Sequence, residues 1–169
     1  SRYAVHIDKA PLEIAAIKER RAGIQDEGSQ ILAIAFANAA QANQPWLDLC
    51  AGPGGKAALL SYLSSEPMYA NEVSAARAEL VSQVVKEGTI VNVGDGREVR
   101  LDVGAVIADV PCTGLGALRR RPEVRWRRSA GDIPNLTKLQ YELAAQAIEI
   151  LDRKSTRLNS SHGYISYAV

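Results

Sequence analysis

At 169 residues the chain is long enough for one domain with a sizeable core, and its 47% apolar and 23% charged residues exclude a disordered or fibrous protein. The net charge of +1 means that any binding to nucleic acid must come from a local basic patch. The two cysteines make no disulfide framework, no apolar run approaches the roughly 20 residues of a membrane span, and no signal peptide is present, so we expect a cytoplasmic protein.

Predicted helices and strands alternate along the chain. The first helix covers residues 28–40, where apolar residues recur at helical spacing after an acidic turn. Strands are predicted in PWLDLCAG, MYANEV, TIVNVGDG and GAVIADVPC, and helices in GKAALLSYLSS, in SAARAELVSQVVKEG up to Gly88, and in the amphipathic segment 134–151. This alternation predicts a parallel sheet covered by helices on both faces.

The carboxyl ends of these strands, where such sheets bind ligands, carry the distinctive residues. The run CAGPGGK after the first strand is either a tight turn or a loop whose backbone approaches a ligand, and three glycines opening a helix favour the ligand. It is not a Walker phosphate loop, because Ala57 follows Lys56. Gly52, Gly54 and Ala57, with Glu72 about 20 residues on, do fit the looser dinucleotide pattern, so a nicotinamide dehydrogenase stays open.

Each acidic residue at the strand ends has two interpretations. Glu72 is either a solvated acid at the start of the next helix or a carboxylate that accepts the hydroxyls of a ribose. Asp95 in GDGR is either a turn residue or part of an adenine site. Asp48, inside an apolar strand, would need a partner if buried, and backbone donors of the glycine turn could supply it. Cys50 is predicted to be a packed side chain whose backbone matters more than its sulfur.

The segment after the fourth strand combines a candidate catalytic residue with a basic cluster. Cys112 follows Asp109 at the strand end and precedes a glycine, so it should face a cleft. A solvated basic face is the plain interpretation of the cluster, whereas its density beside a candidate site favours phosphate contacts, with Trp126 either stacking on a base or packing. The predicted RNA-binding residues are Arg119, Arg120, Arg121, Arg125, Trp126, Arg127 and Arg128.

In order and in register, the motifs GIQDEGSQ, DLCAGPGGKA, NE, GDGR, ADVPCTGLGALRRRPEVRW and LTKLQYELAAQAI resemble those of the RNA 5-methylcytosine methyltransferases, the bacterial ribosomal RNA type related to eukaryotic nucleolar proteins. The resemblance covers residues 23–151 and implies a partial catalytic domain with a Rossmann-like, class I S-adenosylmethionine-dependent α/β fold. The implied strand order is 3-2-1-4, with the later strands missing. Residues 1–22 would then be a linker from an N-terminal RNA-binding region.

The same resemblance implies S-adenosylmethionine as the cofactor and RNA, ribosomal RNA above all, as the substrate of a monomer that needs no membrane and no metal. The loop from Cys50 to Lys56 would hold the methionine end, Glu72 the ribose, Asp95 the adenine side, and Asp109 the zone between cofactor and base. Gly52 stands where many relatives have alanine, which we expect to be a mild change. The implied cofactor-binding residues are Cys50, Ala51, Gly52, Pro53, Gly54, Gly55, Lys56, Glu72, Arg77, Asp95 and Asp109.

The family's chemistry explains its need for cysteine. Carbon 5 of cytosine is a poor nucleophile until a thiolate adds to carbon 6, and Asp109 would hydrogen-bond the ring during that attack. By the resemblance, Cys112 is not the attacking thiol but assists the breakdown of the adduct. The nucleophile of the family lies at the end of the next strand, and this chain has no cysteine there.

Residues 152–169 stand where the family continues into a turn and a fifth strand. Back-translated, the run from Asp152 to His162 resembles a common short-read sequencing adapter and ISYAV resembles its continuation, so we hypothesise a translated adapter, with a genuine divergent tail as the alternative. We therefore expect a non-native, disordered or loosely docked tail that leaves the fourth strand unpaired. The chain would bind cofactor without turnover; the alternatives are a non-catalytic cofactor-binding module and, third, the dehydrogenase.

Overall fold

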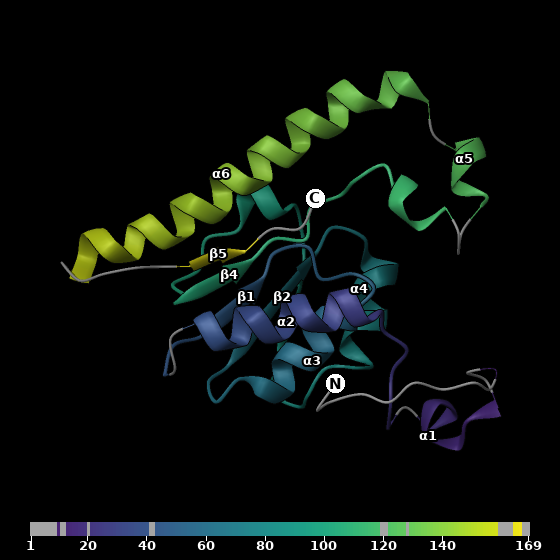
Figure 1. Ribbon diagram of the computed structural model, residues 1–169. Helices are drawn as coiled ribbons and strands as arrows, with labels where there is room; N and C mark the ends of the chain where they lie inside the picture. The colour runs from purple at the N-terminus through teal and green to yellow at the C-terminus, as the bar shows by residue number, and fades with distance from the viewer. Residues whose placement is uncertain are drawn as a thin grey trace.

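The computed structural model describes residues 10, 13–19, 21–40, 43–118, 122–127, 129–158 and 164–166 (Figure 1). The helices are α1 (Ala15–Lys18), α2 (Glu27–Ala39), α3 (Gly55–Leu63), α4 (Ala75–Ser82), α5 (Val124–Arg127) and α6 (Ile133–Leu158). The strands are β1 (Trp46–Asp48), β2 (Met68–Glu72), β3 (Ile90–Val93), β4 (Ala105–Ile107) and β5 (Tyr164–Ser166). Short 3₁₀ turns are η2 (Gly96–Glu98), η3 (Leu115–Ala117) and η4 (Ala130–Asp132).

All strands are parallel and lie in the order β3-β2-β1-β4-β5. The predicted order 3-2-1-4 is therefore confirmed. Leu47 in β1 pairs with Tyr69 of β2 on one side and with Val106 of β4 on the other. Parallel neighbours need a crossover between them, and α3 and α4 provide two of these crossovers.

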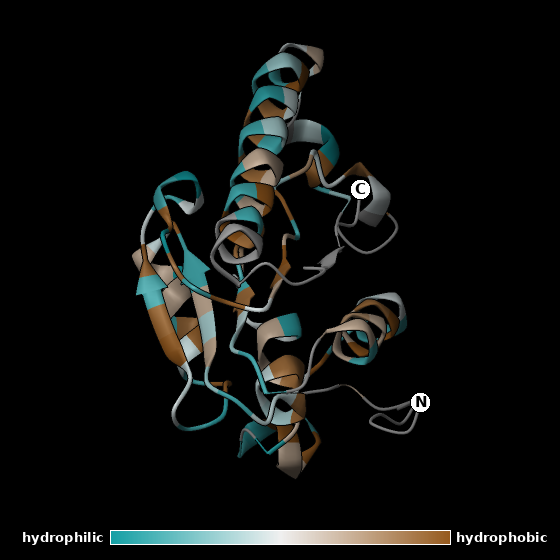
Figure 2. Ribbon diagram, turned by 90° about the vertical axis from the view of Figure 1, so that its left-hand side faces the viewer, coloured by the Kyte–Doolittle hydropathy of each residue, from teal (hydrophilic) through white to brown (hydrophobic). Residues whose placement is uncertain are grey.

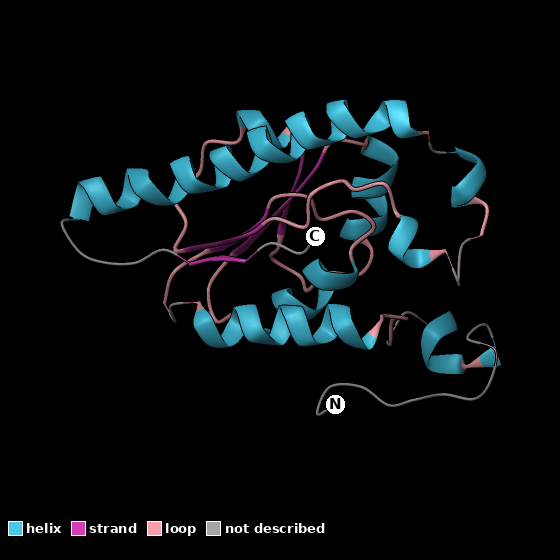
Figure 3. Ribbon diagram, turned by 45° about the horizontal axis from the view of Figure 1, so that its top comes forward, coloured by secondary structure: helices cyan, strands magenta, loops and turns pink. Residues whose placement is uncertain are grey.

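The sheet lies between two helical layers, with α6 on one side and α2 on the other (Figure 3). On the α2 side, Ala33, Phe36 and Leu60 pack with Trp46 against the sheet, and the Phe36 and Trp46 rings meet edge to face at 5.5 Å. On the α6 side, Leu143 and other apolar residues cover Leu47 and Val106. Apolar and polar residues alternate along α6 (Figure 2), which is the pattern of a helix with one buried stripe. Because β1 is buried on both faces, its three residues are all inaccessible to water.

The ends of two helices and the pairing of the last strand differ from the predictions. The helix predicted to reach Gly88 ends at Ser82, because the backbone N–H of Lys86 donates to Ser61 Oγ at 2.9 Å and draws the chain toward α3. The last helix does not stop at 151 but continues to Leu158, since helix-forming residues persist there. Tyr164–Ser166 then pairs with β4 as β5, so the expectation of an unpaired fourth strand is wrong.

Two further features of the described helices complete the fold. Helix α1 is a single turn without buried residues and lies apart from the sheet (Figure 1). Across the ranges given above, no helix has the length and apolar character needed to cross a membrane.

Candidate active site

The loop between β1 and α3 is fixed by its own backbone and by the neighbouring strand. The N–H of Gly54 donates to Ala51 O at 2.7 Å, and the N–H of Ala51 donates to Asn71 O at 2.9 Å. Gly54 has φ +109°, and a Cβ built there would lie 2.7 Å from Val84 Cγ2. Only glycine meets both conditions, so α3 begins at Gly55 with its amide groups directed toward the carboxyl ends of the strands.

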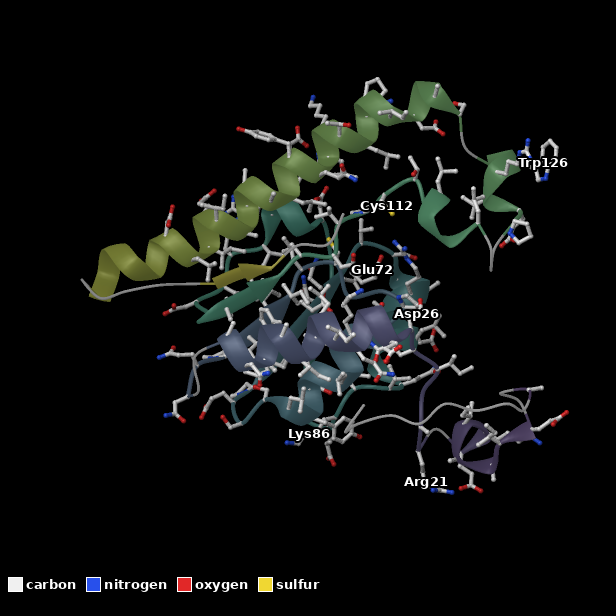
Figure 4. The ribbon with its side chains drawn as sticks, in the orientation of Figure 1. Arg21, Asp26, Glu72, Lys86, Cys112 and Trp126 are labelled. Carbon is white, nitrogen blue, oxygen red and sulfur yellow. The ribbon has the colours of Figure 1, made fainter. Side chains whose placement is uncertain are left out.

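Glu72 at the end of β2 is buried, with 4% of its surface exposed, and both of its carboxylate oxygens have partners. One carboxylate oxygen accepts from the N–H of Gly52 at 3.0 Å. The other accepts from the N–H of Ser74 at 2.9 Å and pairs with Arg77 Nη2 at 2.6 Å. Glu72 therefore ties the glycine loop to the start of α4, and its position labelled in Figure 4 is at the centre of the strand ends.

Gly52 is in tight contact with that carboxylate. A Cβ built on Gly52 would lie 2.2 Å from Glu72 Oε2 and 2.8 Å from its Cδ. An added methyl group would require the Glu72 carboxylate, the end of a flexible side chain, to shift, so the expectation that glycine in place of alanine is a mild change stays a prediction.

Asn71 belongs to the site although the sequence interpretation assigned it no role. Its Nδ2 donates to Leu49 O at 3.3 Å and to Gly94 O at 3.0 Å, and its Oδ1 accepts from Asn92 Nδ2 at 2.6 Å. One side chain thus joins the segments that follow β1 and β3. A buried polar residue inside an apolar strand was the available signal.

Asp48 is buried, and as predicted it takes a backbone donor of the glycine turn, the N–H of Cys50 at 3.3 Å. Burial raises the pKa of Asp48 to about 7, with the nearby carboxylates of Asp109 and Glu72 adding to the rise and Lys56 opposing it. The same burial, with Asp48 next, raises the pKa of the Cys50 thiol to about 12. Cys50 is therefore a thiol at neutral pH, whereas the greater importance of its backbone stays a prediction.

Asp109 and Lys56 join the loops after β4 and β1. Lys56 Nζ forms an ion pair with Asp109 Oδ2, in which the lysine side chain is 15% exposed and the aspartate 40%. Cys112 follows on the same loop and is exposed. The loop is held from the other side by Gln140 of α6, whose Nε2 donates to Pro111 O at 2.8 Å. The structure thus brings Asp109 to the buried acidic cluster and leaves Cys112 open to solvent.

Asp95 lies at the edge of this arrangement. It caps η2 by accepting from the N–H of Arg97 at 2.9 Å, and the Arg97 guanidinium bridges it to Glu142 with contacts of 2.6 Å. The hydrogen bonds from Arg97 hold the pKa of Asp95 below its usual value. Its carboxylate is therefore already engaged by a neighbouring cation.

Two amides before and within α2 also escaped the sequence interpretation. Gln25 Nε2 and Gln30 Oε1 are buried, and neither has a hydrogen-bond partner among the described residues. Gln25 Nε2 lies 3.8 Å from the Cβ position of Gly55 at the start of α3. Buried amide atoms without partners are uncommon, and the amide of Gln25 borders the candidate ligand loop.

Of the predicted RNA-binding residues, Arg125 and Trp126 are described with their side chains, and both are exposed on α5. The side chain of Arg127 and the whole of Arg119, Arg120, Arg121 and Arg128 lie outside the described residues. Within the described part of the chain, no three His, Cys, Asp or Glu side chains gather as a metal site would require.

Comparison with known proteins agrees with this geometry. The sequence profile described as "16S rRNA methyltransferase RsmB/F" matches residues 35–169. The chain is 46% identical over 160 residues to the predicted methyltransferase Rv1407 of Mycobacterium tuberculosis, covering 89% of this chain and 35% of that protein. It is 30% identical over 150 residues to the human 28S rRNA (cytosine(4447)-C(5))-methyltransferase, covering 83% of this chain and 18% of that protein.

Among solved structures, the crystal structure of PH0851 matches with a TM-score of 0.75 and 28% identity, covering 85% of this chain and 34% of that one. The chain thus spans about a third of the Mycobacterium relative and of PH0851, and less of the human one. The chain belongs to the 16S rRNA methyltransferase RsmB/F family, whose relatives include RNA cytosine-C5 methyltransferases.

Proposed function

We propose that this chain carries the cofactor-binding part of an enzyme that methylates carbon 5 of cytosine in RNA, with ribosomal RNA as the substrate and S-adenosylmethionine as the cofactor. One observation carries the proposal. The glycine loop and the carboxylate of Glu72 are joined by the Gly52 N–H at the carboxyl ends of the strands, beside the Lys56–Asp109 pair.

The chemistry of these groups fits that cofactor. S-adenosylmethionine has a sulfonium and an ammonium group, which carboxylates attract, and ribose hydroxyls, which carboxylates bind as acceptors. Asp48, Glu72 and Asp109 are close enough for their charges to influence one another, so the site is acidic. Glu72 would accept from the ribose through the lone pair that Gly52 leaves free on Oε2, since Ser74 and Arg77 occupy the other oxygen.

The methyl group would come from the sulfonium, and the residues of this chain would position the base. Lys56 holds the Asp109 carboxylate by the ion pair, and Asp109 is half-exposed, so it can accept from the target ring. Cys112, exposed on the same loop, would assist the breakdown of an adduct, which is the role that the family resemblance implies. Asp95 would bind the adenine side of the cofactor while its carboxylate remains paired with the Arg97 guanidinium.

Turnover needs a thiolate that this 169-residue chain does not offer. Its only cysteines are Cys50 and Cys112. Burial raises the pKa of Cys50 to about 12 and so keeps its thiol protonated. Cys112 would serve in the breakdown of the adduct and not in the attack. We therefore propose that the chain binds cofactor without multiple turnovers.

Titration calorimetry tests cofactor binding. S-adenosylmethionine and S-adenosylhomocysteine should bind and NAD should not, whereas preferred binding of NAD would support a dehydrogenase. Glu72→Gln should weaken binding at least tenfold, because it removes an ionised acceptor, and Glu79→Gln on the exposed face of α4 is the matched control. Equal affinity of both variants would remove Glu72 from the site.

Methyl transfer from labelled S-adenosylmethionine to unmodified ribosomal RNA tests the proposed lack of turnover, with a full-length relative as the positive control. The chain should give no more than background transfer. Several turnovers per molecule would contradict both the missing nucleophile and the role given to Cys112. If the chain bound neither S-adenosylmethionine nor S-adenosylhomocysteine, it would still belong to the family but would have another ligand.

A further inference from the structure

The two tryptophans of the chain lie in opposite environments. Trp46 in β1 is 5% exposed and packs on Phe36, whereas Trp126 on α5 is 84% exposed. Burying an indole ring is among the largest hydrophobic gains available to a side chain, and exposed aromatic anchors are typical of binding surfaces. An indole that the fold leaves almost wholly in solvent therefore suggests an external partner.

One face of this ring already has a cation. The guanidinium carbon of Arg125 lies 5.7 Å from the centroid of the Trp126 ring, within cation–π range. This contact orients the ring while leaving the other face free for a planar group. The other five arginines of the cluster lie within seven residues of Trp126 in the sequence, so positive charge is concentrated in this part of the chain.

The segment that presents the ring is held by α6 near one end and by the turn η4 at the other. On the Cys112 side, Gln140 Nε2 holds Pro111 O, and on the other side the N–H of Ser129 donates to Asp132 Oδ2 at 2.9 Å, just before α6 begins. In Figure 4 Trp126 projects outward from α5 at one end of the molecule, whereas Cys112 lies nearer the centre, close to Glu72. The ring is thus on the same segment of the chain as Cys112 but outside the candidate site.

We propose that Trp126, with Arg125 on one face, is a stacking platform for an unpaired base of the RNA strand that flanks the target cytosine. The inference rests on the RNA substrate of the proposed function. Every base has a planar face, which stacks on aromatic rings without sequence preference, while nearby arginines neutralise the phosphates. A base inside a duplex offers no free face, so the platform selects single-stranded RNA.

The two tryptophans provide the test. Selective excitation of tryptophan in the whole chain follows the exposed Trp126 and the buried Trp46 together, and a short single-stranded RNA should quench the Trp126 part. A duplex of the same sequence should quench much less. Trp126→Phe, which leaves Trp46 as the reporter, should abolish the quenching while RNA affinity, measured by anisotropy of a labelled RNA, stays within about threefold.

Trp126→Ala should weaken single-stranded RNA binding about 5- to 100-fold, since it removes one stacked base. Tyr141→Ala is the matched control, because Tyr141 is also an exposed aromatic ring but lies on α6. Unchanged RNA affinity of Trp126→Ala, or equal quenching by duplex RNA, would overturn the platform. Quenching by an apolar peptide and not by RNA would also overturn it, in favour of a protein partner.

These outcomes are separable from those of the proposed function. Retained S-adenosylmethionine binding with no effect of Trp126→Ala would remove only the platform. Base stacking on Trp126 in a chain that binds no S-adenosylmethionine would keep the platform and remove the cofactor.

Discussion

Two regions at the same end of the sheet are built in different ways. In the glycine-loop region, which comprises residues 49–56, 71–74 and 94–97, buried polar groups join one strand end to the next through Glu72 and Asn71. In the β4–α6 segment, residues 109–132, the described side chains are mostly exposed, and its attachments are the ion pair of Asp109 and the hydrogen bonds at Pro111 and Ser129.

This difference suits two kinds of ligand. A small cofactor is bound best by a site that is already rigid, because little ordering is needed when it binds. A large polymer needs surface that it can reach, and Cys112 and Trp126 are on such a surface. Substitutions should therefore have large effects on the glycine-loop region and small effects on the β4–α6 segment.

The largest difference in stability is expected between alanine substitutions at two glycines with positive φ. Gly54→Ala should lower the free energy of unfolding by about 3 kcal/mol or more, because strain at φ +109° adds to a clash with Val84 Cγ2 at 2.7 Å. Gly114→Ala, at φ +76° and 3.6 Å from Val124, should cost about 1 kcal/mol from strain alone. Urea denaturation of both variants measures this, and equal losses would contradict a rigid glycine loop.

The second largest difference is expected between the reactivities of the two thiols, Cys50 and Cys112. With its pKa near 12 instead of 9.0, Cys50 has about 10³-fold less thiolate, which its greater nucleophilicity offsets in part, so iodoacetamide should label it roughly 30- to 60-fold more slowly than an ordinary thiol. The exposed Cys112 should account for the fast phase. Mass spectrometry of Cys50→Ser and Cys112→Ser separates the phases, and a fast phase that survives in Cys112→Ser would show that Cys50 is reactive.

Asp48 should make stability depend on pH. Its folded pKa of about 7 is above the ordinary 3.8, so the folded state holds the proton more tightly and stability falls as pH rises through 7. Between pH 5 and pH 8 this fall should be about 2 kcal/mol, and Asp48→Asn should remove it. The exposed Asp102→Asn is the control. Parallel pH profiles for wild type and Asp48→Asn would contradict the buried position of this carboxylate.

A methyl group at Gly52 should have a moderate effect. Gly52→Ala should cost about 1–2 kcal/mol, because the methyl displaces Glu72 Oε2 and the N–H to carboxylate bond is lost. Gly55→Ala, whose added Cβ meets only Gln25 at 3.8 Å and stands at the start of α3, should be neutral or stabilising. Thermal unfolding of the two variants measures these effects. A Gly52→Ala variant with unchanged stability would support the expectation of a mild change.

The sequence predicted the sheet and the position of the site because both rest on local patterns. Glycines at Gly52 and Gly54, and acids at Asp48, Glu72 and Asp109, each directly follow or end an apolar strand, and strand ends of a parallel sheet meet at one edge.

What the sequence missed depends on contacts between distant residues. The roles of Asn71 and Gln25 require the packing of neighbouring segments, and the early end of α4 results from the Ser61–Lys86 hydrogen bond. The pairing of β5 with β4 was missed because three residues without an apolar period carry little signal of their own.

The smallest effect should come from Gln140, which holds the β4–α6 segment. Gln140→Leu removes the bond to Pro111 O, and because that carbonyl can turn to water, the loss should be about 0.5 kcal/mol or less. Gln146→Leu on the same helix is the counterpart, since its Nε2 donates to Val99 O from a buried position. That variant should cost about 1 kcal/mol, because Arg100 still donates to the same carbonyl and prevents a larger loss. Denaturation midpoints of the two variants give the comparison, and a larger loss for Gln140→Leu would mean that the β4–α6 segment is as integral to the fold as the glycine-loop region.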